Sequence, residues 1–116
     1  MRHRKKRKVL NRGTSELRLM LKNMAASFFI YEKIRTTETK AKLIKPILEK
    51  IITIGKKNDL ASRRKILKLM SNNALASKII KNISTKYINR PGGYTRIIKL
   101  GRRKGDNAKI VEIKLV

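Results

Sequence analysis

The pattern of the chain changes at Arg90-Pro91-Gly92-Gly93-Tyr94-Thr95-Arg96, a stretch that separates two parts with different hydrophobic periods. Before it, leucine, isoleucine and methionine recur at spacings of three and four, the period of an amphipathic helix. After it, apolar and polar residues alternate, which is typical of strands. A helical front followed by a stranded end predicts an α+β fold with about four helices.

Four helices are predicted in the part before this stretch. Apolar spacing and break signals place them at about residues 15–32, 38–54, 60–70 and 74–85. The second is expected to be the most buried helix, because apolar residues cover much of its circumference. Pro46 lies inside it and removes a backbone donor, so this helix either kinks at Pro46 or begins near it.

Three short strands complete the prediction. Residues 33–37 form a brief strand or an extended link, and residues 94–100 and 110–115 form two strands with alternating apolar side chains. Residues 101–107 join the last two strands and end in the turn formers Gly-Asp-Asn, which favours a hairpin. Because no internal repeat or low-complexity linker interrupts it, the segment 13–116 is predicted to be one domain.

The charge balance is the strongest functional signal. The 116 residues include 32 Lys and Arg but only 7 Asp and Glu, which gives a formal net charge of +25. Such an excess attracts polyanions and repels copies of the same protein. High charge with 4% aromatic residues is also common in disordered chains, but a hydrophobic share of 41% at regular periods favours a folded core. A folded protein with a polyanionic partner is therefore predicted.

Residues 1–12 carry seven Lys or Arg and no acid. Self-repulsion should keep this segment extended until phosphates neutralise it, so we expect an extended basic N-terminal arm that binds nucleic acid. The alternative is a tail that only solubilises the protein.

The sequence also indicates an intracellular, cytoplasmic protein without a membrane partner. It contains no cysteine, which fits a reducing compartment. The basic start is not followed by the apolar segment of a signal peptide. The longest apolar run, Phe28 to Tyr31, is far shorter than the roughly 20 residues of a membrane span.

Enzyme activity is not indicated. The chain has one histidine and seven scattered carboxylates, so no acid–base pair, metal site or cofactor is expected, and His3 is expected to contact phosphate. Asp106 has three candidate roles, namely binding a backbone amide, pairing with an arginine or holding magnesium beside RNA, and a satisfied turn aspartate is favoured. Gly92 and Gly93 lack the further residues of a nucleotide-binding motif, so no small-molecule substrate is expected.

The stretch from Arg90 to Arg96 is also a candidate RNA clamp. Guanidinium groups suit phosphates, and glycines allow a backbone to approach closely. The ring of Tyr94 could either stack on a base or pack in the core. Two further basic groups, Arg63–Arg64 in the third helix and Arg102–Lys104 in the hairpin loop, are candidates as groups.

Several of these segments resemble the bacterial large-subunit ribosomal protein seventeen family (bL17), and the resemblance covers nearly the whole chain. The matching segments, in order, are the Arg2-His3-Arg4 start, Leu10-Asn11-Arg12, Asn23-Met24, Thr36-Thr37, Lys40-Ala41-Lys42, Arg63-Arg64, Arg90 to Arg96 and Gly105-Asp106-Asn107-Ala108. The most specific are Gly92-Gly93-Tyr94-Thr95-Arg96 and Gly105 to Ala108. This chain departs from the family pattern at Glu16-Leu17, where His-Arg is usual, and at Lys114, where the family has a glutamate.

The resemblance implies a structural protein of the large ribosomal subunit with a two-layer α+β fold, in which about four helices pack on a small mixed β-sheet. Its implied partners are the large-subunit (23S) ribosomal RNA and neighbouring large-subunit proteins near the peptide exit region. The residues expected to bind RNA are Arg2, His3, Arg4, Lys5, Lys6, Arg7, Lys8, Asn11, Arg12, Arg18, Lys22, Lys40, Lys42, Arg63, Arg64, Arg90, Gly92, Gly93, Tyr94, Arg96, Arg102, Arg103 and Lys104.

Two other functions are compatible with the charge alone. The first is a DNA-compacting architectural protein, although the hairpin loop lacks the apolar wedge that such proteins insert into the minor groove. The second is a membrane-active basic helix, for which the first helix has too few cations on its polar face. Competition between ribosomal RNA and duplex DNA separates the first from RNA binding, and liposome binding in physiological salt tests the second.

Overall fold

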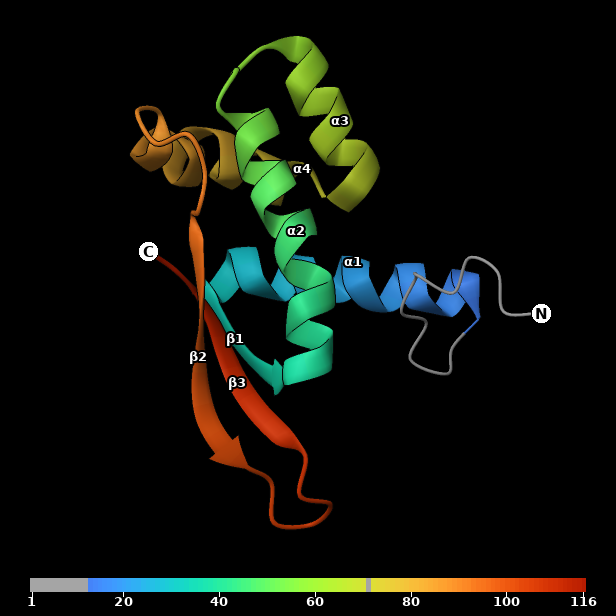
Figure 1. The fold of residues 1–116 in the computed structure, drawn as a ribbon. Helices are drawn as coiled ribbons and strands as arrows, with labels where there is room; N and C mark the ends of the chain where they lie inside the picture. The colour runs from blue at the N-terminus through green and yellow to red at the C-terminus, as the bar shows by residue number, and fades with distance from the viewer. Residues whose placement is uncertain (1–12, 71) are drawn as a thin grey trace, which may run out of the picture.

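In the computed structural model, which describes residues 13–70 and 72–116, helices dominate the chain up to Tyr87 and two of the three strands follow it (Figure 1). The α+β class is confirmed. In chain order the elements are α1 (Thr14–Tyr31), β1 (Lys33–Thr37), α2 (Glu38–Gly55), α3 (Leu60–Met70), α4 (Asn73–Lys78), a π-helical segment (Ile79–Ile83), a 3₁₀ turn (Ser84–Tyr87), β2 (Thr95–Arg102) and β3 (Lys109–Leu115).

The three strands form one sheet in the order β1-β3-β2. Both β1 and β2 pair antiparallel with β3, so the prediction of a mixed sheet is wrong. The reason is topological. The hairpin makes β2 antiparallel to β3, and β1 joins the other edge of β3 in the opposite direction to it, so no parallel pair arises. A bulge between Lys99 and Gly101 interrupts the register of β2 near the hairpin.

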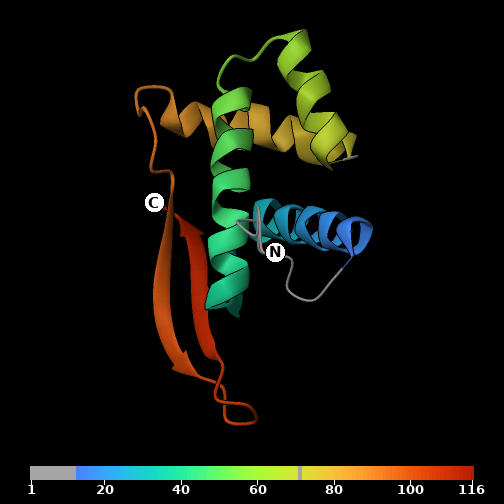
Figure 2. The ribbon, with the colours of Figure 1, turned by 45° about the vertical axis from the view of Figure 1, so that its right-hand side comes forward.

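The helices cover one face of this sheet (Figure 2). Helix α2 contacts all three strands, α1 contacts β1, α3 packs against α1 and α2, and α4 packs against α1 and α3. Side chains alternate across the sheet, and Val111 and Ile113 of the central strand point to the helices and are fully buried. The opposite face is not covered by the helices of the described chain.

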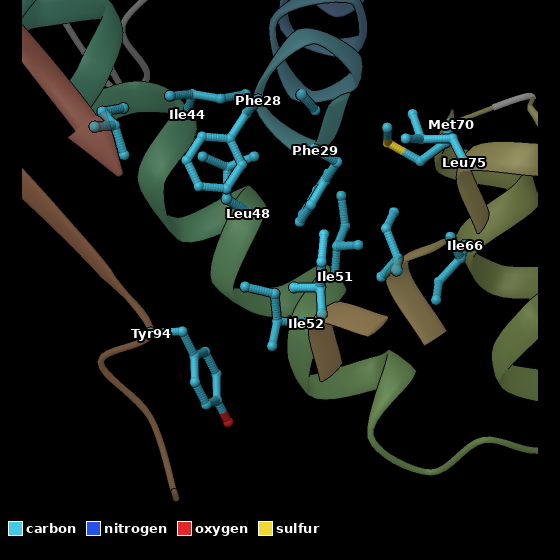
Figure 3. Close-up of a cluster of buried hydrophobic side chains, with 14 of the residues drawn as sticks. Phe28, Phe29, Ile44, Leu48, Ile51, Ile52, Ile66, Met70, Leu75 and Tyr94 are labelled. Atoms are coloured by element: carbon cyan, nitrogen blue, oxygen red, sulfur yellow. The ribbon is translucent and has the colours of Figure 1, made fainter. Parts of the chain in front are cut away.

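Helix α2 is the centre of the core. Its stripe of Ile44, Leu48, Ile51 and Ile52 is almost completely buried, as the apolar period predicts (Figure 3). From α1, the neighbouring Phe28 and Phe29 rings meet edge to face, with centroids 5.2 Å apart and planes at 81°. Helix α2 runs without a break from Glu38 to Gly55 with Pro46 inside it, so of the two alternatives the start near Pro46 is excluded.

The fourth predicted helix is not a regular α-helix over its whole length. After α4 the chain widens into the π-helical segment and then tightens into the 3₁₀ turn, so the prediction of one helix over 74–85 is wrong beyond Lys78. Ile79, Ile80 and Ile83 of the π-helical segment are buried in the core. In the 3₁₀ turn, the Ser84 hydroxyl donates to the Ile52 carbonyl of α2 at 3.2 Å.

Candidate nucleic-acid interface

The candidate RNA-binding residues that the structure describes lie at several separate places on the surface. The nine candidates of the predicted arm lie outside the described residues, and they are Arg2, His3, Arg4, Lys5, Lys6, Arg7, Lys8, Asn11 and Arg12. The others lie on the turn before β2, on the hairpin between β2 and β3, on the sheet, and on α1, α2 and α3.

The turn before β2 keeps its shape through local bonds. The Arg90 backbone amide donates to the Tyr87 carbonyl at 2.9 Å, and the Arg90 Nε donates to the Gly92 carbonyl at 3.2 Å. Gly93 has a φ of +64°, in the left-handed region where a Cβ would add strain. Arg90 and Gly93 are both exposed, so this turn offers a guanidinium beside open backbone.

Tyr94 packs in the core rather than facing a ligand. Its side chain is 1% exposed, and its ring lies 5.2 Å from the ring of Tyr87. The candidate role of Tyr94 in base stacking is therefore wrong for this structure, because neither face of the ring is open to a nucleobase. The physical reason is the scarcity of aromatic side chains in the chain: this ring fills the space between α2 and the end of the sheet.

Lys56 is a residue that the sequence did not single out. Its Nζ donates to the Arg90 carbonyl at 2.6 Å and to the Tyr94 hydroxyl at 2.9 Å. The same ammonium lies 5.1 Å from the centre of the Tyr94 ring. The hydrogen bond from Lys56 is the main cause that lowers the pKa of Tyr94 below its ordinary value. The hydrogen bond from Thr53 also lowers this pKa, whereas burial raises it. Lys56 thus joins the end of α2 to the turn, and no local sequence signal indicates a contact across more than 30 positions.

The hairpin loop is ordered by Asp106. Its carboxylate accepts two hydrogen bonds from Arg103, at 3.0 Å from Nε and 2.6 Å from Nη2, and a third from the Ala108 amide at 3.2 Å. These bonds lower the pKa of Asp106 to about 2, and the bond from Arg103 has the largest effect. Of its three candidate roles, Asp106 therefore has the backbone-amide and arginine roles, as the favoured turn aspartate.

The hairpin lies close to the start of α2. Lys42 lines one groove together with Arg103, Asp106 and Lys109. The Lys42 Nζ lies 3.0 Å from the Glu38 carboxylate, and this bond lowers the pKa of Glu38. The structure thus brings together Lys42 and the hairpin cations, which are about 60 positions apart in the chain. Of these, Lys42 and Arg103 are each paired with an acid.

The other hairpin cations and Lys40 have different surroundings. The Arg102 guanidinium donates to the Asn107 carbonyl at 3.2 Å, whereas Lys104 is exposed at the tip. Lys40, in the first turns of α2, is half-buried. None of the three is in an ion pair within the described part of the chain, so each keeps its positive charge for a ligand.

Arg18 and Lys22 of α1 form a second group with Lys68 of α3. The three line a groove where α1 meets the end of α3. Arg63 donates from Nη2 to the Ser77 hydroxyl at 2.7 Å and so links α3 to α4, whereas Arg64 is exposed. Arg63 of the predicted group Arg63–Arg64, like Arg103 of the predicted group Arg102–Lys104, therefore makes a structural contact in addition to carrying charge.

Within residues 13–70 and 72–116, no three His, Cys, Asp or Glu side chains are close enough together to hold a metal ion. Over the same residues, no helix is both long and apolar enough to cross a membrane. The described surface is dominated by cations, and only four of them lie in ion pairs there: Arg35, Lys42, Lys86 and Arg103.

The fold and the surface define the class: this is a small, strongly basic α+β protein that presents cations at several places on its surface. A family model described as "Ribosomal protein L17" matches residues 20–116. The chain belongs to the ribosomal protein L17 family.

Similar proteins agree with this assignment. The chain is 45% identical over 116 residues to a large ribosomal subunit protein bL17 of Syntrophus aciditrophicus, with all of this chain and 93% of the relative covered. It is 44% identical over 116 residues to the bL17 of Syntrophotalea carbinolica, with all of this chain and 75% of the relative covered. It is 49% identical over 107 residues to the bL17 of Pseudarthrobacter chlorophenolicus, where the match covers 92% of this chain and 56% of the relative.

Proposed function

We propose that this protein is a structural constituent of the bacterial large ribosomal subunit, in the cytoplasm, and that it binds 23S ribosomal RNA by neutralising and bridging phosphates. Membership of the ribosomal protein L17 family carries the assignment to the subunit. The charge of +25 supports the mode of binding, since the described chain pairs few of its cations internally. The role is structural and not catalytic.

The proposed contacts are spread over the domain and the arm. The turn around Arg90, the hairpin cations with Lys42, and the group on α1 and α3 each offer guanidinium or ammonium groups to phosphate oxygens. Residues 1–12 are proposed to become ordered between RNA helices on binding. We also propose that the protein lies near the peptide exit region and contacts neighbouring large-subunit proteins there.

Binding of the full chain to a 23S ribosomal RNA transcript over a range of salt concentrations tests this function. If about ten cations contact phosphates, the logarithm of the affinity should fall with the logarithm of salt concentration with a slope of about −9 on duplex-like RNA and about −7 on single strands. A second sample includes duplex DNA of equal length as a competitor.

The two outcomes are distinct. Preference for the ribosomal transcript, with co-sedimentation of the protein with large subunits at moderate salt, supports the proposal. Equal affinity for duplex DNA, or sedimentation apart from both subunits, would instead favour the DNA-compacting alternative.

A further inference from the structure

The face of the sheet that points away from the helices carries a row of three cations. In the register of the sheet, Lys114 of the central strand lies directly opposite Lys33 of β1 and directly opposite Arg96 of β2. Directly opposed side chains on one face have Cβ atoms about 5 Å apart. The adjacent row of Ile34, Ile113 and Ile97 packs in the core on the helix side, which places the three cations on the other side.

We call this side the outer sheet face. The next row on it contains its one acid, Glu112, between Arg35 and Ile98. The Glu112 carboxylate lies 3.5 Å from the Arg35 Nε. Within the residues that the structure describes, none of the three cations in the first row is in an ion pair. The first two rows of the outer sheet face consist of Lys33, Arg35, Arg96, Ile98, Glu112 and Lys114.

This arrangement opposes the stability of the free protein. Like charges directly opposite each other weaken a pair of strands, and Lys114 has such a neighbour on both sides. The exposed Lys33 and Arg96 leave room for a ligand above the row, where an anion would turn the repulsion into attraction. A phosphate group suits the row, since an arginine fork and two ammonium groups can share its oxygens.

The outer sheet face also connects two candidate contact regions. The turn around Arg90 precedes one end of β2, and the hairpin follows the other end (Figure 1). Because β2 has eight residues, these regions lie roughly 24 Å apart at about 3.4 Å per residue. One polyanion that lies along β2 could therefore contact both regions and the row between them.

The side chains of this face favour a duplex over a single strand. The paired strand residues on this face include no aromatic ring, so it has no platform on which unpaired bases could stack. Phosphate and sugar contacts without stacking are typical of the recognition of double-stranded RNA by shape.

We infer that the outer sheet face binds the phosphate backbone of a double-stranded segment of ribosomal RNA, with Lys33, Lys114 and Arg96 at its centre. This inference rests on the proposed function and assigns a site to Lys33, Arg35 and Lys114, which the sequence did not single out. It applies to the folded domain and does not depend on the arm.

The test compares two variants of the full chain with the same loss of charge. The face variant carries Lys33→Gln, Arg96→Gln and Lys114→Gln. The control variant carries Lys50→Gln, Lys65→Gln and Lys81→Gln, three exposed lysines on α2, α3 and the π-helical segment. Circular dichroism first establishes that both variants are folded, and binding to a 23S ribosomal RNA transcript is then measured from 50 to 200 mM salt.

The face variant is expected to bind at least tenfold more weakly at 50 mM salt, with a slope less steep by about 2–3, because three phosphate contacts are lost. The control variant should change by less than threefold. Equal losses in the two variants would overturn the inference, because only total charge would then matter. If the unsubstituted protein does not bind the transcript, the proposed function itself fails, which is a different result.

Directed cleavage distinguishes RNA from a protein ligand. Since the natural chain has no cysteine, Arg96→Cys and Lys50→Cys can each carry a single tethered hydroxyl-radical probe in reconstituted large subunits. Cleavage of both strands of one RNA helix from position 96, and not from position 50, supports the inference. Absence of RNA cleavage from position 96, with an acidic ribosomal protein cleaved instead, would overturn it.

Discussion

The two faces of the same three strands have opposite chemistry. On the inner face, Val111 and Ile113 are fully buried, and α2 packs against their strand. On the outer face, the residues next to them in the chain are Glu112 and Lys114, and Lys114 faces a cation on each side. The inner face stabilises the fold, whereas the outer face reduces that stability while the protein is free. The comparison teaches that alternation along a strand can combine a packing surface and a binding surface in the same seven residues of β3.

The largest effect is expected on the inner face. Ile113→Ala should destabilise the protein by about 2–5 kcal/mol, because it leaves a cavity beside α2. The matched change on the outer face, Ile98→Ala, should cost less than about 1 kcal/mol, since Ile98 is only half-buried. Urea unfolding of the two variants measures the difference. Equal costs would contradict the contrast between the faces.

The next effect concerns the junction between the core and the turn. Lys56→Met should cost about 1–2 kcal/mol of stability, because the Arg90 carbonyl and the Tyr94 hydroxyl lose their donor. It should also raise the pKa of Tyr94, which the Lys56 hydrogen bond lowers. Ultraviolet titration of the tyrosines, with Lys57→Met as the control, measures this shift. An unchanged titration would show that Lys56 does not hold the hydroxyl in solution.

A smaller effect with the opposite sign is expected on the outer face. Lys114→Gln should raise the stability of the free protein by about 0.2–1 kcal/mol at low salt, because it removes two cross-strand repulsions. The gain should shrink as salt screens the charges. Urea unfolding at 20 and 500 mM salt tests both parts, with Lys50→Gln as a control for net charge. A loss of stability in Lys114→Gln would refute the repulsion.

The smallest effect is confined to the hairpin. Because the folded pKa of Asp106 is about 2 and its ordinary value is 3.8, its ion pair with Arg103 stabilises the loop fully above about pH 4. That contribution is lost as the pH falls through 2. Carboxyl chemical shifts should therefore show Asp106 titrating near pH 2, and Arg103→Gln should raise this midpoint toward 3.8. A midpoint near 3.8 in the unsubstituted protein would contradict the observed pair.

Local patterns predicted the elements well and their arrangement less well. The third helix has its predicted range, and each of the first two differs from its own predicted range by no more than one residue at either end. This agreement is expected, because the apolar period and the break residues are local signals. The irregular segment after α4 was missed, since the apolar spacing of its residues is also that of a regular helix. The antiparallel sheet and the burial of Tyr94 also depend on contacts between distant segments.

The candidate site shows the same limit. The sequence indicates which segments are basic, and the basic turn and hairpin do lie on the surface. It does not indicate the row on the outer sheet face, because that row depends on the pairing of β1 with β3, in which Arg35 and Glu112 are 77 positions apart. Which charged residues lie opposite each other on neighbouring strands can be determined only when the register of the sheet is known.

The most direct test of this account is the melting temperature of the folded chain with and without a 23S ribosomal RNA transcript. Without RNA and at low salt, the face variant should have a higher melting temperature than the unsubstituted protein. With RNA, the melting temperature of the unsubstituted protein should rise by more than that of the face variant. The same rise in both proteins, with no gain in the free variant, would contradict the claim that RNA phosphates compensate the cations of the outer sheet face.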